Sequence, residues 1–238
     1  MKFNLFIKKL HSAKKPLLAI LIDPDKFNPE LIKIANSCKV SCFLVGGSVL
    51  KSGNITKTVN VIKTLSNIPV ILFPGDENQL SKYADGLFLP SLISGRNPDY
   101  LIEKHITMAP KINVMKLQHL PMAYILIDGG KPSQTQIVTK TMPLNPQNSS
   151  YIVNTALAAE HLGFKLLYLE AGSGAKVGIP TSLVRTIKKQ VKIPVIVGGG
   201  IDSVQKMKKV INSGANIIVV GNALEKDVYL LPKLSMCF

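Results

Sequence analysis

Three short apolar runs in the second half of the sequence are each followed by a glycine-containing segment. These segments are Tyr168-Leu169-Glu170-Ala171-Gly172-Ser173-Gly174, Val197-Gly198-Gly199-Gly200-Ile201 and Val220-Gly221-Asn222. Glycine lets the backbone approach a ligand closely and point its N–H groups at an anion. One glycine pair in such a turn is often only structural, but three such turns in succession predict a phosphate-binding cup.

A carboxylate stands beside this cup at position 170. Side chains alternate along a strand, so Tyr168 and Glu170 share one face. They point into the site if the neighbouring leucines pack on the opposite face. A carboxylate placed there can accept hydrogen bonds from a polyol hydroxyl or take its proton. The alternative is a structural glutamate paired with a lysine, and the catalytic interpretation of Glu170 is favoured.

An acid and a hydroxyl follow two apolar runs nearer the N-terminus. Asp23 follows the run Leu17–Ile22, and Ser48 follows two glycines at the end of the next run. If these runs are adjacent strands, the two side chains come close together. Mg²⁺ is usually bound by a few protein oxygens together with substrate phosphates. Asp-Pro and Gly-Gly-Ser are also ordinary turn sequences, so spacing alone leaves the metal site open.

Eight short apolar runs alternate with longer amphipathic stretches along the chain. We predict strands at Leu17–Ile22, Ser41–Val45, Pro69–Phe73, Gly86–Leu89, Pro121–Ile127, Lys165–Leu169, Pro194–Val197 and Asn216–Val220, and helices at Asn28–Lys39, Ile55–Leu65, Pro98–His105, Tyr151–Leu162, Ser182–Gln190 and Ser203–Asn212. Such alternation predicts βαβ units around a parallel sheet. Eight units in 238 residues favour a single α/β domain, a (β/α)8 TIM barrel over residues 1–238. An open doubly wound sheet is the alternative.

Two connections depart from an ideal barrel. Asp76–Asp85, between the third and fourth predicted strands, is too short for a full crossover helix, so we expect the third helix to be reduced or missing. Gly129–Asn148, after the fifth strand, is long and rich in Gly, Pro, Ser, Thr and Asn. Loops of this length are usually functional or mobile. This one is therefore either a lid over the site or a tolerated surface insertion.

Composition and charge restrict the class of protein. The chain carries 29 Lys+Arg against 14 Asp+Glu, a formal charge of +15, and 46% of its residues are hydrophobic. That apolar fraction excludes a disordered chain, and three cysteines are too few for a disulfide scaffold. No apolar run reaches the roughly 20 residues of a membrane span, so we expect a cytoplasmic protein. The positive charge reflects either solvated helix faces or an anionic partner. Scattered lysine pairs without interleaved aromatics argue against nucleic acid.

Five segments together resemble the geranylgeranylglyceryl phosphate synthase family, which includes the bacterial heptaprenylglyceryl phosphate synthases. They are Leu21-Ile22-Asp23-Pro24-Asp25, Val45-Gly46-Gly47-Ser48 and the three glycine-containing segments above, of which Tyr168–Gly174 is the most specific. The resemblance extends from about Leu17 to Leu224. It implies a TIM barrel without a regular third helix. It also implies a prenyltransferase of ether phospholipid synthesis, which joins a prenyl diphosphate to the 3-hydroxyl of sn-glycerol 1-phosphate. Geranylgeranyl diphosphate is the expected donor.

The resemblance further implies roles for individual residues. Asp23 and Ser48 would bind Mg²⁺, and Glu170 would orient or deprotonate the acceptor hydroxyl. Glycerol 1-phosphate would be bound by Tyr168, Leu169, Glu170, Ala171, Gly172, Ser173, Gly174, Gly199, Gly200, Gly221 and Asn222. Candidates for the diphosphate are Arg96, Asn97 and Lys131. Leu21 stands where one of the family's two groups has a lysine, so the chain resembles the second group.

Partners follow from the same resemblance, and two other functions stay open. We expect a homo-oligomer, and the positive charge would favour a membrane surface, where a lipid substrate resides. Apolar residues along the second to fourth strands would line a groove for the prenyl tail.

One alternative is another phosphate-binding TIM-barrel enzyme that acts on a sugar phosphate. It needs a Schiff-base lysine or an acid–base pair at the rim, and no apolar groove. The other is a noncatalytic protein that binds nucleic acid.

Overall fold

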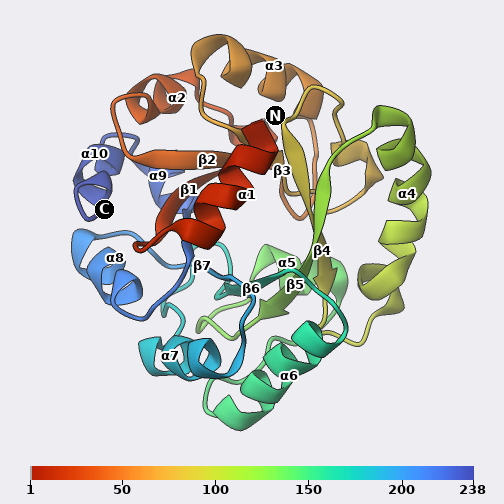
Figure 1. Ribbon diagram of the computed structural model, residues 1–238, viewed down its shortest axis with the longest axis vertical. Helices are drawn as coiled ribbons and strands as arrows, with labels where there is room; N and C mark the ends of the chain where they lie inside the picture. Colours follow the sequence, from red (N-terminus) through yellow and green to blue (C-terminus); the bar gives the residue numbers. More distant parts are fainter. Residues whose placement is uncertain (1) are drawn as a thin grey trace.

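Eight parallel strands form a closed barrel in the computed structural model, which describes residues 2–238 (Figure 1). The strands are β1 (Leu17–Ile22), β2 (Val40–Val45), β3 (Val70–Leu72), β4 (Gly86–Leu92), β5 (His119–Leu126), β6 (Leu166–Glu170), β7 (Val195–Gly198) and β8 (Ile217–Val220). Each strand pairs with the next in the sequence, and β1 pairs with β8 to close the barrel, with Leu17 opposite Ile217. The predicted (β/α)8 barrel is therefore confirmed, and an open sheet is excluded.

Helices follow most strands and surround the barrel in Figure 1. They are α2 (Pro29–Ala35), α3 (Ile55–Leu65), α4 (Lys104–Met115), α5 (Gln134–Thr139), α6 (Ser149–His161), α7 (Thr181–Gln190), α8 (Val204–Ile211), α9 (Asn222–Lys226) and α10 (Leu230–Ser235). Five of them begin after a capping side chain, namely Asn28, Asn54, Ser133, Asn148 and Ser203. Such caps accept backbone N–H groups that the first helical turn leaves without partners.

The connection between β3 and β4 contains a single 3-10 turn, η2 (Glu77–Gln79), where other connections have a helix. This confirms the prediction that the helix between the third and fourth strands is reduced or missing; the helix labelled α3 lies before β3. Gln79 is buried, and its amide donates to the carbonyl oxygen of Gly47 and accepts from the Gly47 N–H, both at 2.9 Å. The reduced connection thereby fixes the glycine turn that carries Ser48.

The predicted helix Pro98–His105 is wrong in extent. A π-helical segment, η3 (Asp99–Glu103), precedes α4, which continues past Pro110 to Met115. Proline inside a helix removes a hydrogen bond and usually kinks or ends the helix. Met108 and Ile112 are nevertheless buried on the same side of α4. Their packing against the barrel outweighs the local cost of the proline.

An N-terminal helix, α1 (Lys2–Ser12), lies across the amino ends of the strands, in front of the barrel in Figure 1. Phe3, Phe6 and Leu10 are buried, and the two rings lie 6.2 and 6.3 Å from the ring of Phe88 inside the barrel. The helices predicted from the sequence do not include this one. The spacing of the three buried residues is nevertheless typical of one helical face.

Alternating side chains divide the apolar core into two layers. Ala19, Tyr168 and Ile196 belong to the cluster inside the barrel. Leu167 and Leu169 belong to the cluster between the strands and the surrounding helices. The predicted inward orientation of Tyr168 is therefore confirmed. None of the helices in residues 2–238 combines the length and hydropathy that a membrane span requires.

Candidate functional site

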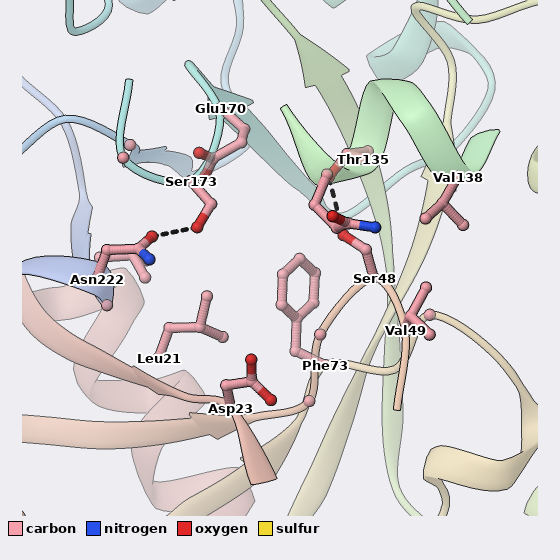
Figure 2. A pocket seen from close by; sticks show the side chains of 18 of the residues that line it. Leu21, Asp23, Ser48, Val49, Phe73, Thr135, Val138, Glu170, Ser173 and Asn222 are labelled. Atoms are coloured by element: carbon pink, nitrogen blue, oxygen red, sulfur yellow. Dashed lines mark hydrogen bonds between the residues drawn. The ribbon is translucent and has the colours of Figure 1, made fainter. Parts of the chain in front are cut away.

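A cavity of about 650 Å³ opens at the carboxyl ends of the strands (Figure 2), where the active sites of barrel enzymes lie. Its lining includes Asp23, Ser48, Phe73, Tyr124, Thr135, Glu170, Ser173, Gly199, Gly221 and Asn222. These residues come from seven of the eight strand ends and from α5. The barrel thus brings the acids, hydroxyls and glycines singled out in the sequence to one site.

The glycine-containing segments after β6 and β7 approach each other closely. Gly174, Gly199 and Gly200 have positive φ angles of 65°, 86° and 71°, a conformation that glycine adopts readily. A Cβ atom on Gly199 would lie 2.5 Å from Oε1 of Glu170 and 2.9 Å from the nitrogen of Ala171. Only glycine at position 199 therefore allows the backbone to pass beside the Glu170 carboxylate.

Ser173 and Asn222 join the first and third glycine-containing segments. The Ser173 hydroxyl donates a hydrogen bond to Oδ1 of Asn222, drawn as a dashed line in Figure 2. The Asn222 amide in turn donates to Oε2 of Glu225 at 3.1 Å. The turns after β6 and β8 therefore form one polar wall of hydroxyl, amide and backbone groups, which suits a phosphate or a polyol.

Most of the predicted phosphate-binding residues line this cavity, but three do not. Those that do are Tyr168, Glu170, Ser173, Gly174, Gly199, Gly200, Gly221 and Asn222. Leu169 and Ala171 are buried in the layer beneath the helices, because their side chains alternate with those facing the barrel. Gly172 directs its N–H at the Glu170 carboxylate. These three residues support the cup from behind.

Glu170 is buried at the end of β6. Its Oε1 accepts a hydrogen bond of 2.7 Å from the N–H of Gly172, and the Tyr168 hydroxyl donates to the same carboxylate. Burial raises the pKa of Glu170 from 4.5 to about 7, against the lowering effect of both hydrogen bonds. Glycine at position 198 leaves room for the Tyr168 and Glu170 side chains, since a Cβ there would lie 2.6 Å from Oε2 of Glu170. Glu170 can therefore exchange a proton near neutral pH.

Asp23 lines the cavity just after the end of β1. Its Oδ1 accepts a hydrogen bond of 3.0 Å from the N–H of Asp25. Its Oδ2 lies 3.7 Å from the ammonium group of Lys26, which Glu225 binds more closely at 2.9 Å. Burial raises the pKa of Asp23, which indicates a carboxylate with incomplete stabilisation of its charge. An additional cation would supply that stabilisation.

Ser48 lies in the turn after β2, and its hydroxyl points toward α5. Its Oγ is 3.0 Å from Oγ1 of Thr135 (Figure 2). Within residues 2–238, no group of three His, Cys, Asp or Glu side chains is placed to hold a metal. Asp23 and Ser48 both line the cavity, and carboxylate and hydroxyl oxygens are donors of the type that binds Mg²⁺ together with substrate and water.

The residues predicted to bind the diphosphate lie in different places. The Arg96 guanidinium donates to two carbonyl oxygens of its own loop. The Asn97 amide donates to the carbonyl oxygen of Thr139 at 2.9 Å. Both side chains thus hold loops together, and neither is among the residues that line the cavity. Lys131 is closer to the cup, because its Nζ lies 3.1 Å from where a Cβ on Gly174 would be.

Other lysines line the cavity, and sequence reasoning missed them. They are Lys26, Lys51, Lys104 and Lys226. Lys26 had a signal in its spacing, because it follows the predicted metal ligand Asp23 by three residues. Nothing in the sequence distinguishes the other three from the many lysines on helix faces.

The long connection Gly129–Asn148 contains α5 and covers part of the cavity. Thr135, Ile137 and Val138 of this helix line it. The Tyr100 hydroxyl donates to the carbonyl oxygen of Val138 at 3.4 Å. The connection therefore lies at the site, where the sequence placed it, and its role as a lid stays a prediction.

Part of the cavity wall is apolar. Its residues are Val49, Phe73, Pro74, Pro90, Leu92, Tyr100, Met108, Tyr124, Ile137 and Val138. They come mainly from the ends of β2 to β5, from η3 and α4, and from α5. This wall corresponds to the groove predicted along the second to fourth strands, beside the connection that lacks a helix.

Comparisons with known proteins agree with this geometry. A model described as the PcrB family matches residues 11–233. The geranylgeranylglyceryl phosphate synthase of Flavobacterium johnsoniae is 45% identical over 228 residues, 92% of this chain and 93% of that protein. The enzyme of the same name from Pyrococcus horikoshii is 40% identical over 218 residues, 90% of this chain and 85% of that protein. A crystal structure of (S)-3-O-geranylgeranylglyceryl phosphate synthase from Thermoplasma acidophilum, in complex with substrate sn-glycerol-1-phosphate, has a TM-score of 0.88 and 30% identity, covering 97% of this chain and 94% of that chain.

Proposed function

The chain belongs to the PcrB family, and we propose that it is a prenyltransferase of the geranylgeranylglyceryl phosphate synthase type. The 3-hydroxyl oxygen of sn-glycerol 1-phosphate forms a bond with C1 of a prenyl diphosphate while the C1–O bond to the diphosphate breaks. The observation that carries this proposal is the combination, in one cavity, of buried Glu170, a glycine cup and an apolar wall. A sugar-phosphate enzyme has use for the first two features but not for the third.

The acceptor would be held on the side of the cavity formed by the turns after β6, β7 and β8. Backbone N–H groups of Gly199, Gly200 and Gly221 and the side chains of Ser173 and Asn222 suit its phosphate and hydroxyl groups. This places the 3-hydroxyl beside the Glu170 carboxylate. As the ether bond forms, Glu170 accepts the hydroxyl proton.

The donor diphosphate would lie toward the turns after β1 and β2. Asp23 and Ser48 would hold Mg²⁺ there, and a bound Mg²⁺ stabilises the negative charge that develops on the leaving diphosphate. Lys26 and Lys51, which follow β1 and β2, also line the cavity and add positive charge. Lys131 stays a candidate ligand, whereas the contacts of Arg96 and Asn97 described above favour a structural role.

The prenyl tail would occupy the apolar wall between the ends of β2 to β5 and helices α4 and α5. Its residues offer no charge to the tail, and burial of each CH₂ group contributes about 0.8 kcal/mol. Geranylgeranyl diphosphate is our first choice of donor, because relatives such as that of Flavobacterium johnsoniae bear its name.

Peripheral contact with an anionic membrane surface is a further part of the proposal. The chain has a formal charge of +15. Ile137 and Met142, in the connection that covers the cavity, are 61% and 74% exposed, and Lys140 lies between them in sequence. Exposed apolar residues beside cationic ones suit the interface of an anionic bilayer.

Self-association is the last part of the proposal. Ile102, Ile106 and Val114 are exposed along η3 and α4, at intervals of four and eight residues. Residues so spaced lie on one side of a helix. A second copy of the chain would cover this apolar stripe, and light scattering of the purified protein measures the number of copies.

The activity is tested with Mg²⁺, radiolabelled sn-glycerol 1-phosphate and a set of prenyl diphosphates from geranyl to heptaprenyl. Transfer of label into an organic extract is the expected result, and sn-glycerol 3-phosphate is the matched control for the acceptor. Failure of every donor would contradict the proposal. Turnover of a sugar phosphate would instead support the alternative barrel enzyme. Flotation with neutral and anionic vesicles tests the membrane contact separately.

A further inference from the structure

Three aromatic rings stack at the mouth of the barrel. The ring centroid of Phe73 lies 5.4 Å from that of Tyr168, and Tyr168 lies 5.2 Å from Tyr124, with interplanar angles of 18° and 13°. Tyr124 and Tyr168 are buried, whereas Phe73 is partly exposed and lines the cavity. Phe73 is therefore the member of the stack that a bound molecule can reach most easily.

The Phe73 ring lies between the two reactive ends of the proposed site. On one side, it stacks on Tyr168, whose hydroxyl donates to the Glu170 carboxylate. A Cβ on Gly46 would collide with the Phe73 carbonyl oxygen, so the backbone of Phe73 packs directly on the turn that leads to Ser48. Figure 2 shows the ring projecting between Asp23 and Glu170. The reacting carbon must also lie between these groups.

The position of Phe73 is fixed by its backbone and by its ring neighbours. Its N–H donates to the carbonyl oxygen of Val45 at 2.9 Å. Its ring is also 6.0 Å from that of Tyr124. A residue held in this way keeps its ring in one orientation, which is what preorganised stabilisation of a transition state requires.

Positive charge must develop next to this ring if the proposed reaction occurs. As the C1–O bond of an allylic diphosphate lengthens, the electron pair leaves with the diphosphate and the allylic carbons become cationic. A carboxylate in direct contact with those carbons would compete with the acceptor hydroxyl as a nucleophile. The face of an aromatic ring attracts a cation within about 6 Å without offering it a lone pair.

We propose that Phe73 is a further catalytic residue of this chain. The face of its ring contacts the allylic carbons and stabilises their positive charge in the transition state, while Glu170 accepts the proton of the incoming hydroxyl. This inference rests on the proposed prenyl transfer. It assigns Phe73 a role distinct from the remaining apolar residues of the wall, which only contact the tail.

A fluorination series tests the role of the ring face. Phenylalanine analogues with one, two and three ring fluorines, incorporated at position 73, keep the shape of the side chain but progressively weaken the attraction of its face for a cation. The single-turnover rate should fall with each fluorine, by about 2- to 30-fold in total. Affinity for an unreactive thiolo analogue of the prenyl diphosphate should change less than twofold, because the ground state carries no allylic charge.

Phe88 supplies the matched control. It is a buried phenylalanine of the same barrel, but it contacts Phe3 and Phe6 at the opposite end and does not line the cavity. The same analogues at position 88 should leave the rate unchanged. Phe73→Leu keeps an apolar side chain without a ring face, and it should lose rate as the trifluorinated variant does while retaining affinity for the thiolo analogue.

The outcomes separate this inference from the proposed function. If the parent protein forms product and its rate is the same across the series at position 73, or in Phe73→Leu, the cation-stabilising role is wrong and prenyl transfer stands. A parallel loss of rate and of affinity would make Phe73 only a binding contact and would also overturn the inference. If the parent forms no product with any prenyl diphosphate, the proposed function fails, and the inference fails with it.

Discussion

Oε1 of Glu170 accepts a hydrogen bond of 2.7 Å from the N–H of Gly172, two residues along the same turn. The bond orients the carboxylate, and the Tyr168 hydroxyl binds it as well. Two hydrogen bonds would normally lower the pKa of a glutamate, yet burial raises this pKa to about 7. The protein therefore holds a well-oriented base whose charge is destabilised, which is a typical property of a catalytic carboxylate.

The pH dependence of the reaction should follow the titration of Glu170. Only the deprotonated carboxylate can accept the hydroxyl proton, so turnover should rise with pH and reach half its maximum near the pKa of about 7. Glu170→Gln keeps the shape and removes the charge, and it should lower turnover about 10²–10⁴-fold. Single-turnover rates across the pH range measure both effects. A parent-like rate in the variant would make Glu170 structural.

The same substitution should stabilise the fold at alkaline pH. Because the folded-state pKa is raised above its ordinary value of 4.5, the unfolded chain releases the proton first as pH rises. Stability is therefore lost between about pH 4.5 and 7, and the loss stays constant above that range at roughly 3 kcal/mol. Glu170→Gln removes this cost. Its free energy of unfolding should exceed that of the parent at pH 8 but not at pH 4, as urea titrations without ligands would measure.

Asp23 and Ser48 should differ in their importance for Mg²⁺. Asp23→Asn removes the charged ligand and should abolish Mg²⁺-dependent turnover, while the fold is kept because the side chain stands at the cavity rim. Ser48→Ala removes a neutral ligand that water can replace, so its effect should be smaller. Titration of activity with Mg²⁺ measures the loss of metal dependence in each variant, and a thermal unfolding curve checks that the fold is kept. Full activity of Asp23→Asn at limiting Mg²⁺ would rule out this metal site.

The barrel and the positions of its candidate site residues can be predicted from the sequence because they depend on local pattern. Short apolar runs specify strands, and alternation within a run specifies which face a side chain takes. This is why the inward face of Tyr168 and the clustering of Asp23, Ser48 and Glu170 around one cavity could be predicted. The missing third helix was equally predictable, because the length of a connection limits what it can contain.

Features that depend on tertiary packing could not be predicted in the same way. Helix α4 continues past Pro110, and its residues Met108 and Ile112 on either side of the proline are buried. Arg96 was a reasonable ligand for a diphosphate by its charge, yet its guanidinium bonds to neighbouring carbonyl oxygens and does not face the cavity. Nothing local in the sequence fixes the direction of a long side chain. The ring stack of Phe73 likewise joins residues from three strands.

Gly221 and Gly199 provide a contrast within the phosphate cup. Gly221 has no positive φ, and a Cβ there would lie 3.3 Å from its nearest neighbour on Leu21. Gly221→Val needs only a small shift of the Leu21 side chain, so it should lose less stability than Gly199→Val and fill the place of the phosphate, raising the KM for glycerol 1-phosphate far more than that for the prenyl donor. Gly199→Val should lower stability as well, because φ is +86° and Glu170 is in the way. Equal losses for both substrates in Gly221→Val would show that the cup is misplaced.

The last prediction concerns Thr135, which connects α5 to the floor of the cavity. Its hydroxyl lies 3.0 Å from that of Ser48, and it also makes a side-chain hydrogen bond with Tyr124. Thr135→Val keeps the shape of the side chain and removes these bonds, which contribute about 0.5–1.5 kcal/mol each. Helix α5 should then be held less firmly over the apolar wall to which Val138 contributes. The KM for the prenyl donor should rise roughly 5- to 150-fold, as the summed energy of the two bonds implies, whereas the KM for glycerol 1-phosphate should not change. Thr135→Ser restores the hydroxyl and should restore the donor KM. Faster proteolytic cleavage within Gly129–Asn148 in the valine variant alone would confirm the loosened helix, and identical kinetics in the valine and serine variants would show that the hydroxyl has no part in holding α5.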